Sequence, residues 1–125
     1  MVDNITYVGL DTHKATITVA VAASGRTGEL RHWGKIANDP AAVERMTRKL
    51  EKAHGRLRFS YEAGPCGYGL YRQLNGLGHE CIVAAPSLIP RAPGDRVQTD
   101  RLDAINLARS DRAGDLTAIW VPDAA

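Results

Sequence analysis

Residues 7–14 read Tyr7-Val8-Gly9-Leu10-Asp11-Thr12-His13-Lys14, and the rest of the chain is organised around them. The segment begins as an apolar run, reaches one carboxylate and then becomes polar, which is typical of a strand buried on both faces. A carboxylate at the end of such a strand is costly in free energy unless a cation or a hydrogen-bond donor meets it. The partner of Asp11 is therefore the question on which the functional interpretation depends.

The composition is that of one globular domain. The chain has 125 residues, of which 44% are hydrophobic and 24% charged, enough to bury a core. The formal net charge of +2 permits a nucleic-acid partner without requiring one. Cys66 and Cys81 lie too far apart for a zinc knuckle, so reduced thiols are expected. Because neither a run of about 18 apolar residues nor a signal peptide is evident, we expect a cytoplasmic protein. The end of the sequence has no helix cap or charged tail, which indicates a chain cut short.

Three strands are expected first, over residues 5–10, 16–22 and 30–36, because each is rich in β-branched or alternating apolar residues. The short connection between the first two strands predicts an antiparallel hairpin, and the two glycines of residues 25–28 predict a turn before the third. Strict alternation in the third strand predicts one face made of Leu30, His32, Gly34 and Ile36, and an opposite face made of Arg31, Trp33 and Lys35.

Helices and strands then alternate. Asn38 or Asp39 is the expected cap of a helix that begins at Pro40 and ends at Gly55. Its predicted buried stripe comprises Val43, Met46, Leu50 and Ala53. The remaining elements are expected as a strand over residues 57–63, a helix over 67–77, a strand over 80–85, a loop over 86–98, a helix over 99–113 and an extended segment over 116–121. In the last helix the expected apolar positions are Leu102, Ile105, Leu107 and Ala108.

This order of elements indicates the fold class. Three meandering antiparallel strands come first, and two more strands are reached through crossover helices, which favours parallel pairing. The prediction is an α/β protein of the ribonuclease H-like (RuvC-like) fold, with a mixed five-stranded sheet and helices on its faces. Fold-level analogy alone does not give a function.

Four carboxylates are the candidate site. Asp11 closes the first strand and Glu62 the fourth, so their side chains lie together at one edge of the sheet if these strands pair. Asp100 and Asp103 are three residues apart in a helix and so share one face. Four such groups without a basic neighbour would repel one another, and divalent cations relieve that repulsion. Oxygen ligands favour Mg²⁺ or Mn²⁺ over zinc, and two such ions about 3.5–4 Å apart can promote cleavage of a phosphodiester.

Each acid also has a purely structural interpretation. Asp11 could bond the backbone of the turn that follows it, and Glu62 could be solvated beyond its strand. Asp100 could cap the last helix, with Asp103 in its first turn. The combination of the four acids with the order of the elements favours the metal site.

Basic residues near these acids are candidate contacts to DNA phosphates, namely Lys14, Arg96 and Arg101. Because the arginines are mixed with acids, simple solvation stays open for them. His13 could contact a phosphate, bind a metal or have no role.

Three blocks of the sequence resemble the N-terminal RuvC-like domain of the bacterial insertion-sequence transposases called DEDD transposases. The blocks are Val8 to Lys14, Tyr61 to Tyr68 and Gly94 to Arg109, in the order of that family. The third block is the most specific. The sequence departs from the family pattern at Gln98, where a lysine is usual, and at Leu102, where a second arginine is common.

The resemblance implies an enzyme that moves an insertion sequence by DNA recombination. It implies that Asp11, Glu62, Asp100 and Asp103 form a catalytic DEDD set that binds Mg²⁺ or Mn²⁺. The implied partners are DNA, in some members a guide (bridge) RNA, further copies of the protein, and a C-terminal domain with a serine nucleophile. That domain is absent from this sequence, so residues 1–125 alone are expected to be incomplete as a recombinase.

Two other functions stay open. A RuvC-like junction nuclease would lack the C-terminal serine domain, so the coding sequence beyond Ala125 would distinguish it. A non-catalytic ribonuclease H-like remnant would bind nucleic acid or a partner without metal, so a titration with Mg²⁺ or Mn²⁺ would distinguish that.

Overall fold

The computed structural model describes residues 5–24, 29–64, 68–85, 96–119 and 121, and of residues 96–100 the backbone alone. The elements are β1 (Thr6–Thr12), β2 (Thr16–Ala22), β3 (Leu30–Ala37), α1 (Pro40–His54), β4 (Leu57–Glu62), α2 (Gly69–Gly76), β5 (Glu80–Ala84) and α3 (Arg96–Ala113). The predicted loop over residues 86–98 lies mostly outside the described residues. No helix in the described part of the chain is both long and apolar enough to cross a membrane.

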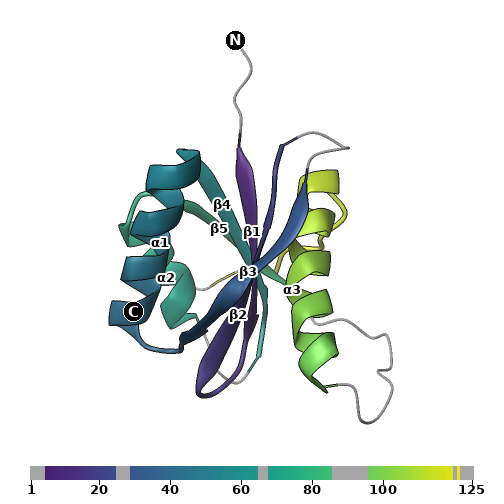
Figure 1. The fold of residues 1–125 in the computed structure, drawn as a ribbon, viewed down its shortest axis with the longest axis horizontal. Helices are drawn as coiled ribbons and strands as arrows, with labels where there is room; N and C mark the ends of the chain where they lie inside the picture. The colour runs from purple at the N-terminus through teal and green to yellow at the C-terminus, as the bar shows by residue number, and fades with distance from the viewer. Residues whose placement is uncertain (1–4, 25–28, 65–67, 86–95, 120, 122–125) are drawn as a thin grey trace.

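The five strands form one sheet in the order β3-β2-β1-β4-β5. Strand β1 is antiparallel to β2 and parallel to β4, β2 is antiparallel to β3, and β4 is parallel to β5. Helices α1 and α2 cover one face of the sheet and α3 covers the other (Figure 1). This order and these directions are those of the ribonuclease H-like fold, so the predicted fold class is confirmed.

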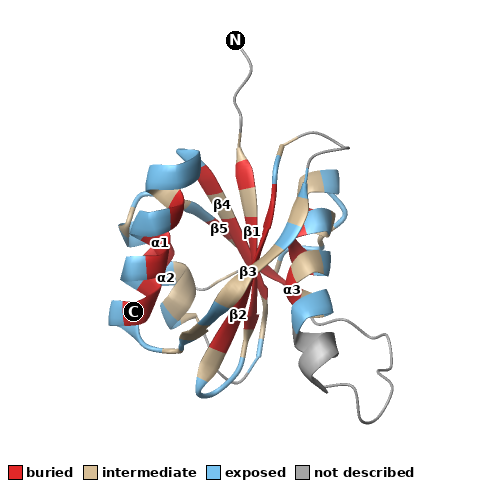
Figure 2. Cartoon of the chain, in the orientation of Figure 1, coloured by how far each residue is buried: buried red, intermediate tan, exposed pale blue. Residues whose placement is uncertain are grey.

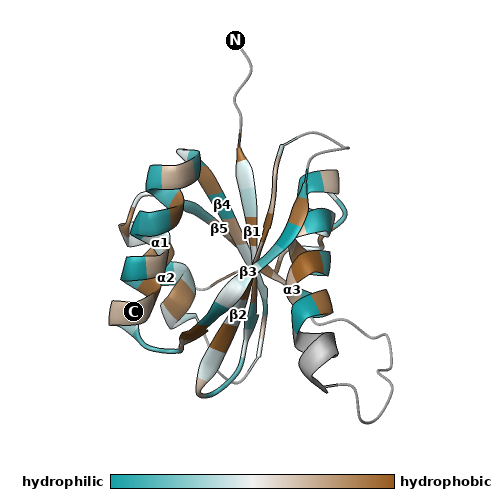
Figure 3. Cartoon of the chain, in the orientation of Figure 1, coloured by the Kyte–Doolittle hydropathy of each residue, from teal (hydrophilic) through white to brown (hydrophobic). Residues whose placement is uncertain are grey.

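The face under α1 and α2 holds the main hydrophobic core. Large side chains of the three central strands, β2, β1 and β4, pack there against α1. The buried residues of the strands are Val8, Leu10, Ile17, Val19, Val21, Phe59 and Tyr61, and those of α1 are Val43, Met46 and Leu50. Buried positions of the helices face the sheet (Figure 2), and hydrophilic residues cover the outer side of α1 (Figure 3). The predicted stripe of α1 is right except at Ala53, which is exposed.

Helix α1 begins where its punctuation predicts. The Ala42 amide donates to Asp39 Oδ1 over 2.8 Å, and Pro40 occupies the first turn. Gly55, with φ of 79°, ends the helix. Asp39 is therefore the cap, which resolves the choice between Asn38 and Asp39.

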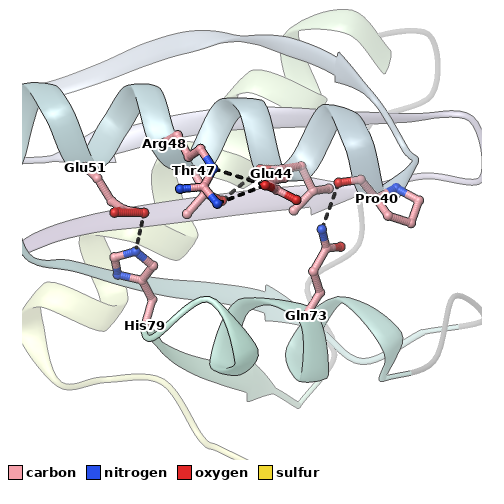
Figure 4. A network of polar contacts seen from close by, with 8 residues as sticks. Pro40, Glu44, Thr47, Arg48, Glu51, Gln73 and His79 are labelled. Atoms are coloured by element: carbon pink, nitrogen blue, oxygen red, sulfur yellow. Dashed lines mark hydrogen bonds and ion pairs between the residues drawn. The ribbon is translucent and has the colours of Figure 1, made fainter.

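Polar contacts tie α1 to α2 and to the residues that follow it (Figure 4). Gln73 Nε2 donates to the Pro40 carbonyl over 2.8 Å. His79 Nε2 lies 3.1 Å from Glu51 Oε1 at the other end of α1. These two contacts hold both ends of α1 and fix the two helices as one layer.

The face under α3 is built differently, from small residues. A Cβ atom placed on Gly9 of β1 would lie 2.0 Å from the Ala104 carbonyl oxygen and 2.7 Å from the Ala108 amide nitrogen. Only a residue without a side chain allows the backbone of α3 to approach β1 this closely. Gly9 therefore sets the distance between α3 and the centre of the sheet.

Two details of the predicted elements were wrong. The register of β2 with β3 shifts between Val19 and Ala20, which puts His32 opposite Ala20 and Lys35 opposite Thr18. His32 and Lys35 therefore share the α3 face, although strict alternation had put them on opposite faces, because an irregularity of this kind adds a residue to one strand.

The start and the apolar stripe of α3 also differ from expectation. The helix begins at Arg96, so Asp100 lies inside it and the interpretation of Asp100 as its N-cap was wrong. Leu102 is 55% exposed rather than buried. The buried positions are Ala104, Leu107, Ala108 and Asp111, which share one face at helical spacing.

Candidate active site

Asp11 and Glu62 lie at the same edge of the sheet on neighbouring strands. The parallel register of β1 and β4 ends with Leu10 beside Tyr61. Asp11 and Glu62 come next on the two strands and therefore follow side by side. Gly9 faces α3, and because side chains alternate along a strand, Asp11 faces α3 as well. The pairing of β1 with β4, on which the predicted adjacency depended, is present.

This line of polar residues continues across the sheet. Thr18 of β2 lies opposite Asp11, and Lys35 of β3 lies opposite Thr18. Directly opposed residues in antiparallel strands point to the same face. We call these four residues, Lys35, Thr18, Asp11 and Glu62, the polar row. The adjacent row on the α3 face has small residues at its middle, namely Ser60, Gly9 and Ala20.

Asp11 is a buried carboxylate with an imidazole against it. Its residue is 9% exposed, and His13 Nε2 lies 2.9 Å from Asp11 Oδ2. An ionised carboxylate can only accept, so with Asp11 ionised the donor of this contact is His13 Nε2. His13 itself is 44% exposed in its side chain. None of the three roles considered for His13 from the sequence was that of a partner to Asp11.

Helix α3 runs against β4 in the opposite direction, and two contacts show how the two elements line up. Arg58 Nε lies 3.2 Å from Asp111 Oδ1. Two residues further along β4, the Ser60 hydroxyl donates to the Leu107 carbonyl over 3.5 Å. Two residues of a strand span about 6.6 Å and four residues of a helix about 6 Å. Every second residue of β4 therefore lies beside every fourth residue of α3.

Moving two more residues along β4 and four more residues along α3 reaches Glu62 and Asp103. Two strand residues lead from Ser60 to Glu62, and four helix residues lead from Leu107 to Asp103. We infer that Asp103, which is half-buried, lies level with the polar row. Asp100 is one turn earlier in α3, and its side chain lies outside the described residues.

The described side chains do not by themselves form a complete metal site. Among them, no group of three or more His, Cys, Asp or Glu residues is arranged to hold a metal ion. The predicted set of four includes the side chain of Asp100, which is not described. Metal binding by the four acids therefore stays a prediction.

The predicted phosphate contacts are distributed around the same edge. Lys14 is exposed in the turn between β1 and β2, and Arg101 is exposed on α3. The backbone of Arg96 begins α3, and its side chain lies outside the described residues.

Two further basic groups, His32 and Lys35, were not found from the sequence. Burial lowers the pKa of His32, and the positive charges of Arg101 and Lys35 lower it further. These three groups therefore lie close enough to repel one another. Only the irregular pairing of β3 brings Lys35 and His32 to this face, which is why strict alternation did not indicate them.

A second buried acid on this face lies at the opposite end of the sheet. Burial raises the pKa of Asp111 to about 6, although the ion pair with Arg58 lowers it. Glu80 lies near the same arginine, with Oε2 3.5 Å from Arg58 Nη1. Because Asp111 faces Arg58 two rows away from Asp11, it has a structural partner and is separate from the candidate site.

Comparison with known protein families identifies the chain. The family model of the IS110-type DEDD transposases, described as "Transposase", matches residues 8–125. The chain belongs to this family. The matched range includes all four predicted acids, and it confirms the resemblance recognised in the three sequence blocks.

Two relatives of this DEDD transposase family member carry transposase names. The chain is 56% identical over 117 residues to a Sinorhizobium fredii protein named as transposase y4qE, covering 94% of this chain and 30% of that protein. It is 40% identical over 107 residues to the transposase for insertion sequence element IS1533 of Leptospira borgpetersenii, covering 86% of this chain and 31% of that protein. The chain thus spans about a third of the length of these relatives.

Solved structures with a similar backbone are distant in sequence. The large terminase nuclease from thermophilic phage G20c is 17% identical, with a TM-score of 0.49 over 90% of this chain and 57% of that chain. T. thermophilus RuvC, in complex with a Holliday junction substrate, is 12% identical, with a TM-score of 0.49 over 91% of this chain and 99% of that chain.

Proposed function

We propose that this chain is the RuvC-like N-terminal catalytic domain of a longer insertion-sequence transposase, and that it binds Mg²⁺ or Mn²⁺ through Asp11, Glu62, Asp100 and Asp103. The observation that carries the proposal is the position of Asp11, a buried carboxylate beside Glu62 on the neighbouring central strand. Family membership supports the assignment to a transposase.

The chemistry of the donor set fits a hard divalent cation. Carboxylate oxygens are the ligands that Mg²⁺ and Mn²⁺ prefer. Two neighbouring carboxylates, one of them buried, repel each other, and a cation between them removes that repulsion. Among the described residues, His13 lies against Asp11 and can neutralise its charge when the imidazole is protonated. Its side chain is 44% exposed, so water weakens this neutralisation. A bound divalent ion would assist the attack and departure of oxygens at a DNA phosphodiester.

The protein's own contribution is rigid placement. Asp11 and Glu62 stand on the two central strands, and α3 is held against β1 by the absence of a side chain at Gly9. Asp103 is thereby kept at a constant distance from the sheet. His13 Nε2 lies 2.9 Å from one oxygen of Asp11, and with Nε2 protonated it would hold that oxygen in place.

Binding of DNA would use the basic groups beside the polar row. Lys14, Lys35 and Arg101 are exposed there, and His32 lies among them. Positive groups of this kind position a nucleic acid through its phosphates without reading its sequence. With a low net charge overall, this local grouping rather than the whole surface would attract the substrate. Arg96 belongs to the same proposal through its place at the start of α3.

The remaining partners rest on family membership alone. We propose that the protein is bacterial and cytoplasmic, and that it acts as a homo-oligomer together with a C-terminal serine domain of the same polypeptide. A guide (bridge) RNA is a further proposed partner, as in some members of the family. Movement of the element would need these parts, because the chain spans about 30% of its relatives' length.

A metal titration tests the catalytic assignment. We expect millimolar Mn²⁺ or Mg²⁺ to raise the melting temperature of the chain, because a ligand that binds only the folded state stabilises it. Asp11→Asn should abolish that rise. Asp115→Asn, which removes an equal charge from an exposed position, should preserve it. A folded wild-type chain whose melting curve does not respond to either metal would favour the non-catalytic remnant instead.

A further inference from the structure

Thr18 is a buried hydroxyl without a hydrogen-bond partner. The residue is 1% exposed, and its Oγ1 makes no hydrogen bond with any of the described residues. Burying a hydroxyl without a partner lowers the stability of the folded state, and a valine of nearly the same shape would avoid that loss. Because buried polar groups in folded proteins almost always have hydrogen-bond partners, the buried hydroxyl of Thr18 needs an explanation.

Two other buried hydroxyls among the described residues are satisfied by the backbone. Thr47 donates to the Val43 carbonyl over 2.8 Å within α1, and Ser60 donates to the Leu107 carbonyl over 3.5 Å. Thr18 lies in β2, between β1 and β3, where the backbone carbonyls pair with neighbouring strands. In the part of the chain that the structure describes, the candidate partners of its hydroxyl are therefore side chains on the α3 face, and a bound group there could serve as well.

The side chain directly opposite Thr18 is Asp11. Opposed residues of antiparallel strands have their Cβ atoms about 4.5–5.5 Å apart. A threonine hydroxyl and a carboxylate at that separation come within hydrogen-bond reach through rotation of their side chains alone. On the other side of Thr18 lies Lys35, which can only donate and cannot satisfy the hydroxyl proton.

We propose that Thr18 is a positioning residue of the metal site, whose hydroxyl donates a hydrogen bond to the Asp11 carboxylate when a divalent cation is bound. The inference rests on the proposed function and extends it to a strand that carries none of the four acids. Carboxylates that bind metals are themselves held by hydrogen bonds from surrounding groups, and loss of such a group costs typically 10–100-fold in metal affinity. Thr18 thus gives up stability in the free protein to orient Asp11 in the loaded one.

The test compares stability with metal affinity in the same variants of this chain. Thr18→Val removes the hydroxyl and keeps the shape, so without metal it should melt at or above the wild-type temperature. Its affinity for Mn²⁺, measured by isothermal titration calorimetry and by the electron paramagnetic resonance signal of free Mn²⁺, should fall about 10–100-fold. Thr18→Ser keeps the hydroxyl and should recover most of the affinity.

Thr47→Val is the matched control. It removes a buried hydroxyl whose bond is satisfied inside α1, so it should lower the melting temperature and leave Mn²⁺ affinity unchanged. This pattern is opposite to that expected of Thr18→Val. A purely structural role for Thr18 would not produce it.

Each other result overturns a definite statement. Wild-type affinity for Mn²⁺ in Thr18→Val would overturn the positioning role while leaving the proposed function in place. A wild-type chain that binds no Mn²⁺ would overturn the proposed function and this inference together. If Thr18→Val fails to fold, Thr18→Ala and Thr18→Ser carry the same comparison, and equal affinities in those two variants would contradict the role of the hydroxyl.

Discussion

The close approach of α3 to β1 makes Gly9→Ala the most informative single substitution. The new Cβ would lie 2.0 Å from the Ala104 carbonyl oxygen and 2.7 Å from the Ala108 amide nitrogen. Both neighbours are backbone atoms of α3, so no side-chain rotation can relieve the contact. To restore an ordinary contact of 3.4 Å, the helix has to withdraw from the strand by about 1.4 Å.

The loss of stability from this displacement should be moderate. Overpacking of a close-packed interface costs about 1–3 kcal/mol. Replacing a strand glycine with alanine returns about 0.5–1 kcal/mol through the lower backbone entropy of the unfolded chain. The net loss is about 0–2.5 kcal/mol, which corresponds to a fall in melting temperature of at most about 8–15 °C for a domain of this size.

The effect on the candidate site should be larger than the effect on stability. Asp100 and Asp103 are carried by α3, whereas Asp11 and Glu62 are carried by the sheet. A withdrawal of more than about 1 Å separates the two pairs, whereas metal–ligand distances are tolerated only within about 0.2 Å. We therefore expect Mn²⁺ affinity to fall sharply in a variant that is still folded at 25 °C.

Circular dichroism melting and calorimetric titration with Mn²⁺ measure the two effects. Gly34→Ala is the matched control, because Gly34 also lies in a strand, and a Cβ there would meet nothing within 4 Å. That variant should melt at or slightly above the wild-type temperature, because it has the same gain in unfolded-chain entropy and no clash, and it should keep the Mn²⁺ affinity of the wild type. If Gly9→Ala behaves like Gly34→Ala, then α3 does not rest on β1 in the way the contact distances require.

The remaining predictions concern three other buried groups. In the full-length protein, Asp11→Asn should abolish excision of the element in a cell-based assay while the fold persists, and retained excision would refute the catalytic role of Asp11. Burial raises the pKa of Asp111 from 3.8 to about 6, so the folded state binds the extra proton and this group's contribution to stability is lost as the pH rises from about 4 through about 6. Urea unfolding at several pH values should show this fall in the wild type and a smaller one in Asp111→Asn, and equal slopes would contradict it. Burial, followed by the charge of Asp111, raises the pKa of the Cys81 thiol to about 12, so iodoacetamide at pH 8 should label Cys81 only after denaturation, as read by peptide mass spectrometry.

The order of the elements could be predicted because it depends on local patterns. The run before Asp11 has the composition of a buried central strand, and Asp39 with Pro40 marks the start of α1 in the residues themselves. The alternation of helices and strands after residue 40 then leaves few possible topologies. The place of Asp11 and Glu62 on paired strands followed from the same reasoning.

Features that depend on contacts between distant segments could not be predicted in this way. The shift in the pairing of β2 with β3 arises between strands, so nothing within β3 indicates that His32 and Lys35 share a face. In α3 the positions against the sheet include Ala104 and Ala108 because the helix is close to Gly9. The predicted apolar positions of this helix included Leu107 and Ala108, which are buried, but they missed Ala104 and included Leu102, which is exposed.

The two faces of the sheet have different roles. One face supplies most of the hydrophobic stabilisation, and the other positions the acids of α3 beside those of the strands. The face under α1 and α2 buries large side chains such as Phe59 and Tyr61, which supply most of the hydrophobic free energy. On the face under α3 there is no side chain at Gly9, and the helix backbone therefore comes within contact distance of the sheet. On this second face the helix backbone is close enough to bring a carboxylate of α3 level with a strand carboxylate at short range. A metal site shared between α3 and the central strands thus requires the small residues beneath the helix as much as it requires the acids themselves.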